Sequence, residues 1–197
     1  MEMKNAQEIM GKNFVGPKEI RSIYGVNIIN FPLVPFSQEQ LVAVKNDHIL
    51  IATSPLSIIG LKGIIGAKMF FWQKSSWYNN EVFAQDRGRV GWELIGKNPV
   101  KNSTDKTLAE QIELLGKNRV TPTAQAIVYL IASYYLITGI FLFGQTSVRT
   151  SSRDSKDYPI EVGVTRGEWI RVSRSNDSKK NIFLGLAESV RPNLFPY

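Results

Sequence analysis

The chain contains no cysteine and only one histidine, His48, among its 197 residues. The lack of cysteine excludes a disulfide framework, a thiolate nucleophile and any metal site built from thiolates. A single histidine without cysteine partners cannot supply a conventional set of zinc ligands. His48 stands at the start of a predicted strand, so we expect it to be structural, and we expect neither a metal nor another cofactor.

The sequence also lacks any block of five like charges, although its net charge is +7. A basic surface can attract nucleic acid, anionic lipid or an acidic partner. Dispersed lysines are more typical of a solvated surface, so nucleic-acid binding stays open only as an alternative. The segment MEMKNAQEIMGKNF has no apolar run of the kind found in secretory signals, and a cytoplasmic location is therefore expected.

The stretch from Ala124 to Gly144 carries no charged residue. Its length suits either a membrane-spanning helix or a buried helix followed by a buried strand. Thr121-Pro122 is a good helix start and Gly139 a good helix end, which favours a helix over 122–138. Residues 140–143 then read as a buried strand. We therefore predict a buried core and no transmembrane span.

The first part of the chain is predicted to be mostly helical. Helical spacing of apolar residues ends at Gly11 and, after a restart at Gly16-Pro17, at Gly25. Ser37 and Gln40 form a capping box for a third helix. Residues 48–52 read as a strand. The apolar, glycine-rich segment 58–69 could be a loop, a hairpin or a partner-binding segment.

Residues 70–72 are expected to form a short strand, and we place a boundary between two domains here, at 1–72 and 73–197. Four aromatic residues lie within 77–92 and are interpreted as core rather than as a stacking surface for bases or sugars. A short helix is predicted near residue 80 and a strand or helix over 90–95. Thr107 and Glu110 form a second capping box, for a helix reaching Leu115.

The C-terminal third alternates between short strands and polar turns. Residues 147–150 and 182–186 read as strands. In 160–164, Ile160, Val162 and Val164 are predicted to form an apolar face, with Glu161 and Gly163 on a free face. In the next strand, Trp169, Arg171 and Ser173 share one side while Ile170 and Val172 share the other. A polar loop covers 173–181.

These residues carry a resemblance. The order of TSS, two alternating strands, a polar loop and the closing FLGLAESVRP resembles the C-terminal half of bacterial C-type-lectin-like domains of the formylglycine-generating-enzyme superfamily. RVTPTAQA occupies the place of that superfamily's RLPTEAEW helix start. The resemblance covers about 77–192 and implies an α+β, C-type-lectin-like fold with a small, mostly helical N-terminal part. Without cysteines, oxidative formylglycine chemistry is excluded, and without an EPN or WND triplet no calcium-dependent sugar binding is expected.

A narrower similarity concerns MGKNF…GPKE, WYNNEVFA, NPVKNST and TPTAQ, which resemble variable proteins of diversity-generating retroelements from candidate-phylum bacteria. The resemblance implies a stable scaffold whose exposed residues recognise a protein or other macromolecule. Carried over by position, those residues correspond to Val164, Arg166, Glu168, Trp169, Arg171, Ser173, Arg174, Ser175, Asn176, Lys180, Asn181 and Phe183.

The leading hypothesis is therefore a non-enzymatic binding protein with one surface patch formed by 164–183. A carboxylate-based hydrolase using Asp154, Asp157 and Glu161 is an alternative, although no nucleophile or base accompanies these acids. The third hypothesis, a basic nucleic-acid binder, predicts steeply salt-dependent binding to arbitrary DNA.

Overall fold

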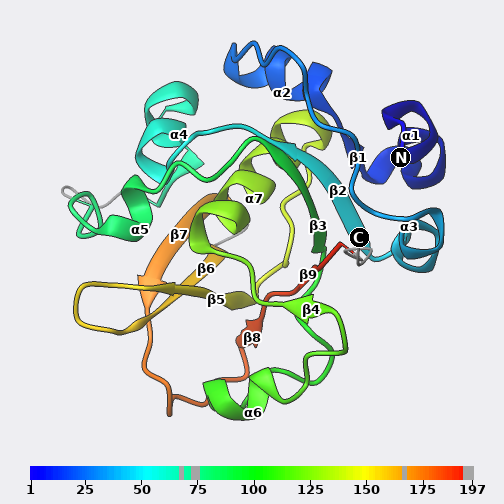
Figure 1. Cartoon of the computed structure of the whole chain (residues 1–197). Helices are drawn as coiled ribbons and strands as arrows, with labels where there is room; N and C mark the ends of the chain where they lie inside the picture. Colours follow the sequence, from blue (N-terminus) through cyan, green and yellow to red (C-terminus); the bar gives the residue numbers. More distant parts are fainter. Residues whose placement is uncertain (67–68, 72–75, 166–167, 193–197) are drawn as a thin grey trace.

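The computed structural model describes residues 1–66, 69–71, 76–165 and 168–192 (Figure 1). Helices and strands are mixed along the chain, which confirms the α+β class. The elements are α1 (Met3–Met10), the 3-10 helix η1 (Gly11–Asn13), β1 (Phe14–Val15), α2 (Pro17–Tyr24), α3 (Gln38–Val44), β2 (His48–Thr53), α4 (Ile58–Ile65), α5 (Val82–Gln85), β3 (Gly91–Gly96), α6 (Leu108–Ile112), β4 (Arg119–Val120), α7 (Ala124–Thr138), β5 (Ser147–Arg153), β6 (Pro159–Thr165), β7 (Trp169–Arg174), β8 (Leu184–Leu186) and β9 (Ser189–Val190).

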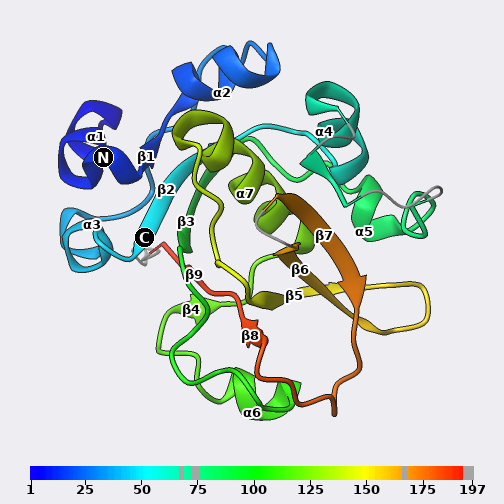
Figure 2. The same cartoon turned by 180° about the vertical axis from the view of Figure 1, so that it is seen from behind.

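Helix α7 occupies the centre of the molecule, with the strands of two sheets on either side of it in both views (Figures 1 and 2). Every residue from Ala124 to Tyr134 is buried, which explains the lack of charge in this part of the sequence. Two buried hydroxyl pairs tie the helix to its neighbours: Tyr24 with Ser133 at 2.8 Å, and Tyr129 with Ser54 at 3.0 Å. Burial raises the pKa of Tyr129 to about 12, so both partners of that pair stay uncharged.

The first sheet, sheet A, has the order β1-β2-β3-β9-β4. Strand β2 pairs antiparallel with β3 over its whole length, from His48 opposite Gly96 to Thr53 opposite Gly91. One hydrophobic core runs from Ala6 to Val190 and includes residues of both sheets. The division into 1–72 and 73–197 stays a prediction, and the two parts share this sheet and this core.

His48 is the first residue of β2 in sheet A. Its side chain is 5% exposed. Its Nε2 atom contacts Arg119 and lies 3.3 Å from a carboxylate oxygen of Glu188. The hydrogen bond from His48 and the charge of Arg119 lower the pKa of Glu188. The position fits the structural role expected for this histidine, because it joins residues of β2, β4 and the segment before β9.

The second sheet, sheet B, has the order β7-β6-β5-β8. Strands β5, β6 and β7 form an antiparallel meander, and β8 pairs with β5 in parallel. Helix α7 packs against β5, β6 and β7. Strand β6 is buried on both faces from Pro159 to Val164, so the prediction that Glu161 and Gly163 face solvent is wrong.

Most predicted helices are confirmed, with small changes at their ends. Helices α1 and α2 are followed by the C-cap residues Gly11 and Gly25, and the capping boxes of Ser37 and Thr107 are present. Helix α6 ends at Ile112 rather than near Leu115. The aromatic residues Tyr78, Phe83 and Trp92 are buried, as predicted for core. The cap of α7 is Thr123, not Thr121, because the Thr123 hydroxyl accepts from the Ala126 N–H at 3.1 Å.

Two apolar segments have a secondary structure that differs from the predicted one. Residues 140–143 form a loop and turn instead of a strand. Phe143 adopts a left-handed φ of 65°, Ile140 is 58% exposed, and Phe141 stacks on Tyr135 of α7 at 3.9 Å. Residues 58–65 form α4, because Ser57 caps the helix and Ile58 and Leu61 are buried while both internal glycines keep helical geometry. Phe70 makes only an isolated bridge to Ile170, and Trp72 lies outside the described residues.

Within the described residues, no helix has the length and apolar character needed to cross a membrane. Gly139 ends α7 after 15 residues with a left-handed φ of 73°. The uncharged run is thus divided between a buried helix and a turn.

Close contact between β5 and β6 gives a first testable prediction. A Cβ at Gly163 would stand 2.5 Å from the Ser147 hydroxyl oxygen and 2.8 Å from the Ser147 Cα, and the latter cannot move away without shifting the strand. We expect Gly163→Ala to lower the free energy of unfolding by about 1–3 kcal/mol, measured by urea denaturation. Gly91→Ala in β3 is the matched control, since nothing lies within 4 Å of its added Cβ. Equal stability of the two variants would contradict the packing.

Candidate functional site

The face of sheet B that points away from α7 carries polar side chains in cross-strand rows. Arg149, Glu161 and Ser173 form one row, and Gly163 lies opposite Arg171 in the next. Ile170 and Val172 of β7 are buried while Trp169, Arg171 and Ser173 are partly exposed. The predicted side-by-side arrangement of those three residues on β7 is therefore confirmed. We call this polar side the outer face of sheet B.

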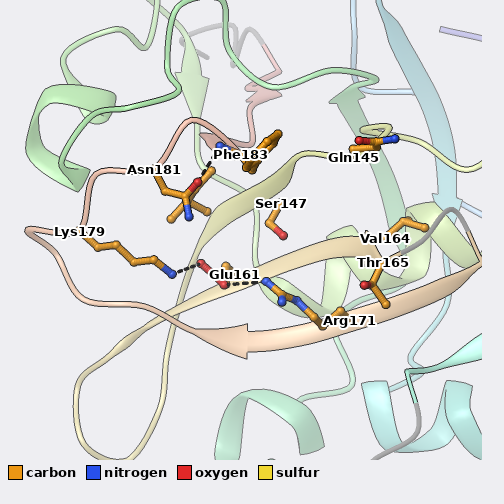
Figure 3. Close-up of a pocket in the computed structure, with 10 residues that line it drawn as sticks. Gln145, Ser147, Glu161, Val164, Thr165, Arg171, Lys179, Asn181 and Phe183 are labelled. Carbon is orange, nitrogen blue, oxygen red and sulfur yellow. Dashed lines mark hydrogen bonds and ion pairs between the residues drawn. The ribbon is translucent and has the colours of Figure 1, made fainter.

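A pocket of about 470 Å³ opens on this outer face (Figure 3). Its walls come from the turn before β5, from β5, β6 and β7, and from the loop 175–183 that follows β7. This volume lies in the range typical of small-ligand sites. The described residues that line it are Gln145, Ser147, Glu161, Val164, Thr165, Arg171, Lys179, Asn181, Phe183 and Leu184.

Glu161 forms the charged base of the pocket, and its side chain is only 3% exposed. One carboxylate oxygen accepts from the Ser173 hydroxyl at 2.8 Å and from Arg171 at 3.2 Å. The other oxygen has no hydrogen bond and lies 3.7 Å from the Lys179 ammonium. A buried carboxylate is costly unless it is paired, so two cations from different segments are held beside it.

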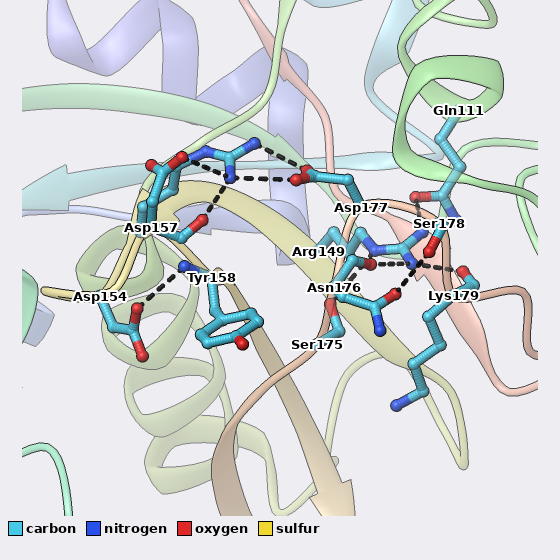
Figure 4. A network of polar contacts seen from close by, with 11 residues as sticks. Gln111, Arg149, Asp154, Asp157, Tyr158, Ser175, Asn176, Asp177, Ser178 and Lys179 are labelled. Atoms are coloured by element: carbon cyan, nitrogen blue, oxygen red, sulfur yellow. Dashed lines mark hydrogen bonds and ion pairs between the residues drawn. The ribbon is translucent and has the colours of Figure 1, made fainter.

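Arg149 lies next to Glu161 in the same row and is fully buried. Its guanidinium donates to the main-chain carbonyl oxygens of Lys106, Asn176 and Lys179, and Figure 4 shows the contacts with Asn176 and Lys179. It also donates to the Gln111 side-chain oxygen at 2.8 Å. Burial lowers the pKa of Arg149, and the nearby charge of Glu161 opposes that shift. This single side chain fixes the backbone of the loop 175–183 against β5 and α6.

Further contacts hold the two ends of the loop. At its start, Asp177 pairs with Arg153 at 2.7 Å, and this bond lowers the pKa of Asp177. Further along, Lys180 donates to Glu110 at 2.9 Å. Glu110 also caps α6 by accepting from the Thr107 N–H, and these bonds lower its pKa to about 2. The loop is thus tied to the β5–β6 hairpin and to α6.

Several of the residues predicted from the resemblance meet at the pocket. Arg171, Asn181 and Phe183 line it together with Val164, and Ser173 bonds to its base. Phe183 is 57% exposed on the rim. Glu168, Asn176 and Lys180 are exposed as well. Trp169 lies beside them at the edge of the sheet, where its ring meets that of Phe71 edge-on at 6.3 Å.

Other predicted residues do not belong to this surface. Val164 and Ser175 are each only 7% exposed, so they cannot contact a macromolecule directly. Arg174 lies on the same face of β7 as Ile170 and Val172, because side chains alternate between the two faces of a strand. Its guanidinium lies 4.0 Å from the centre of the Trp77 ring and 3.1 Å from Asp154. The prediction of one patch containing both Trp169 and Arg174 is therefore wrong for Arg174. Arg166 lies outside the described residues.

Five lining residues with polar side chains were not among the predicted ligand-binding residues: Gln145, Ser147, Glu161, Thr165 and Lys179. Arg149, which supports the loop, was not among them either. Glu161 had a detectable signal, because it is a polar residue at an alternate position in the otherwise mostly apolar strand β6. Such a residue points either to solvent or to a buried polar partner, and the pattern alone favours solvent.

The acids of the hydrolase hypothesis have separate partners. The Asp154 carboxylate accepts main-chain N–H groups of Lys156 and Tyr158 within its own turn and pairs with Arg174. Asp157 is exposed and pairs with Arg153 at 3.6 Å. Of these three acids, only Glu161 is among the described residues that line the pocket.

Comparisons of the chain with protein-family models, with curated proteins and with solved structures find no match.

The role of Arg149 gives a second prediction. Arg149→Met removes the donors that satisfy the carbonyl oxygens of Lys106, Asn176 and Lys179, and it takes one of three nearby cations away from Glu161. We expect the free energy of unfolding, measured with urea, to fall by about 3–5 kcal/mol. Arg153→Met is the matched control: its side chain is 36% exposed, and loss of such a surface pair costs about 1 kcal/mol or less. Similar losses in both variants would show that Arg149 does not organise the loop.

Proposed function

We propose that this chain is a non-enzymatic binding protein that recognises another protein with the outer face of sheet B and the loop 175–183. The observation that carries the proposal is how the loop is held. Arg149 binds the main-chain carbonyl oxygens of Asn176 and Lys179, which every residue type supplies, so this part of the loop's support does not depend on the side chains at those two positions. A rigid scaffold beneath changeable side chains is the arrangement found in binding loops.

The exposed side chains are of the types that anchor protein interfaces. Phe183 and the neighbouring Ile182 are 57% and 64% exposed, and Trp169 and Arg171 are partly exposed on the same side. Aromatic residues and arginine dominate the energetics of protein interfaces. Asn176 and Asn181 add hydrogen-bonding groups with little conformational entropy to lose.

The order of elements also supports the C-type-lectin-like interpretation. A buried helix (α7) is followed by three strands (β5, β6 and β7), then a polar loop, and then β8 and the closing β9. This is the order that the resemblance implies for the C-terminal half of such domains. We extend the proposal accordingly: the chain is the target protein of a diversity-generating retroelement, and its varied positions lie on the outer face of sheet B.

Nucleic-acid binding is less well supported by this surface. Its cations are largely paired: Arg171 with Glu161, Lys180 with Glu110, and Arg153 with Asp177. Phosphate binding draws on cations that are free to displace counterions. The net charge of +7 is thus not concentrated here as an open basic patch among the described residues.

Sequencing this locus in many cells tests the proposal. We expect amino-acid substitutions to concentrate at the exposed or partly exposed positions Glu168, Trp169 and Asn176, because the contacts that hold the loop 175–183 to the scaffold do not use these side chains. Arg149 and Ser175, which are buried beneath the loop, should stay constant and serve as internal controls. A reverse-transcriptase gene beside the locus and a near-repeat of the C-terminal coding region would accompany this pattern. Substitutions spread evenly over strands of sheet A, such as β2 and β3, would reject it.

A further inference from the structure

The pocket beside Phe183 is lined by more positively than negatively charged side chains. Two cations, Arg171 and Lys179, approach one carboxylate, Glu161, from β7 and from the loop (Figure 3). The described residues that line the pocket contain no other charged side chain. Their formal sum is therefore one positive charge, located at the entrance rather than at the base.

Both cations keep hydrogen-bond donors that Glu161 does not use. Arg171 reaches Glu161 through one terminal nitrogen, and the arginine fork carries five N–H donors in all. Lys179 lies 3.7 Å from Glu161, at ion-pair rather than hydrogen-bond distance. The side chains of Arg171 and Lys179 are 41% and 37% exposed, whereas Glu161 is 3% exposed. A ligand thus meets the cations first, and Glu161 acts as the buried counter-charge that keeps them close together.

This arrangement favours an anion. An ammonium or guanidinium group entering the pocket would face two like charges before it reached the buried carboxylate. A carboxylate of the ligand could accept from both cations at once, with Ser147 and Asn181 as further polar neighbours. Phe183 supplies an exposed apolar wall for the rest of the ligand.

We propose that the pocket binds an aspartate or glutamate side chain of the protein partner, with its carboxylate between Arg171 and Lys179. This inference rests on the proposed function. The residue beside that acid in the partner packs against Phe183. The pocket volume of about 470 Å³ accommodates one such side chain. Because the cations are already held by Glu161, little side-chain freedom is lost when the acid binds.

The test is a titration of the whole chain, followed by NMR, with single-residue probes blocked at both ends. The probes are N-acetyl glutamate N′-methylamide and its glutamine and lysine counterparts, so only the side chain differs. We expect the glutamate probe alone to shift the amide signals of Ser147, Gly163, Asn181 and Phe183 in a saturable way. Binding should weaken roughly tenfold in Arg171→Gln or Lys179→Gln, as for the loss of one charge-assisted hydrogen bond.

Three controls keep the result interpretable. Arg171→Lys retains the charge and should keep most of the binding, while Lys12→Gln removes one exposed charge in η1 and should change nothing. A melting curve for each variant shows whether it is folded. Raising sodium chloride to about 0.3 M should weaken binding of the glutamate probe, because the cations are partly exposed.

Equal shifts with the glutamine probe, stronger shifts with the lysine probe, or no shifts with any probe would each overturn the acidic-ligand inference. These results are independent of the substitution pattern at the locus. If the substitutions concentrate at the exposed positions but the glutamate probe does not bind, the binding surface stands and the ligand chemistry is wrong. If the probe binds but substitutions are spread evenly, the pocket stands and the variable-protein proposal fails.

Discussion

The hydrogen bonds from buried Arg149 to loop carbonyls are the contacts on which the outer face of sheet B depends. A guanidinium with no solvent exposure has to satisfy its donors inside the protein, and it does so on Lys106, Asn176 and Lys179 and on the Gln111 side chain. The charge itself is offset by Glu161, the next residue in the cross-strand row. A change at Arg149 therefore releases the loop, α6 and the base of the pocket together.

Glu161 links this support to the exposed surface. It compensates Arg149 on one side and holds Arg171 and Lys179 on the other. Buried charges add little to stability compared with apolar residues of the same volume, but removing one partner leaves the other uncompensated. The row Arg149–Glu161–Ser173 fits a role in fixing one geometry of strands and loop, with the partly exposed charges of Arg171 and Lys179 at the entrance of the pocket.

The local rules of helix capping predicted much of the fold, because they depend on residues three or four apart. Ser37 with Gln40, Thr107 with Glu110, and Gly139 after α7 all appear where the sequence indicated. The same reasoning failed for 140–143, where apolar residues fill a turn, and for α4, where glycines lie inside a helix. For the site, alternation placed Trp169, Arg171 and Ser173 correctly. It could not show that Glu161 is buried, because that depends on Arg149 and Lys179, which are distant in sequence.

The same alternation limits which positions of the surface are free to vary. Along β7, Arg171 and Ser173 lie on the outer face of sheet B, while Arg174 lies on the opposite face, where it is partly exposed and packs on the Trp77 ring. In the loop, Asn176 offers its carbonyl to Arg149 and leaves its side chain exposed, whereas the side chain of Ser175 is itself buried against the guanidinium. Neighbours in sequence thus have opposite constraints. A binding surface built here can change at every position whose contribution to the scaffold is main-chain only, and must keep those whose side chains satisfy Arg149 or fill the core.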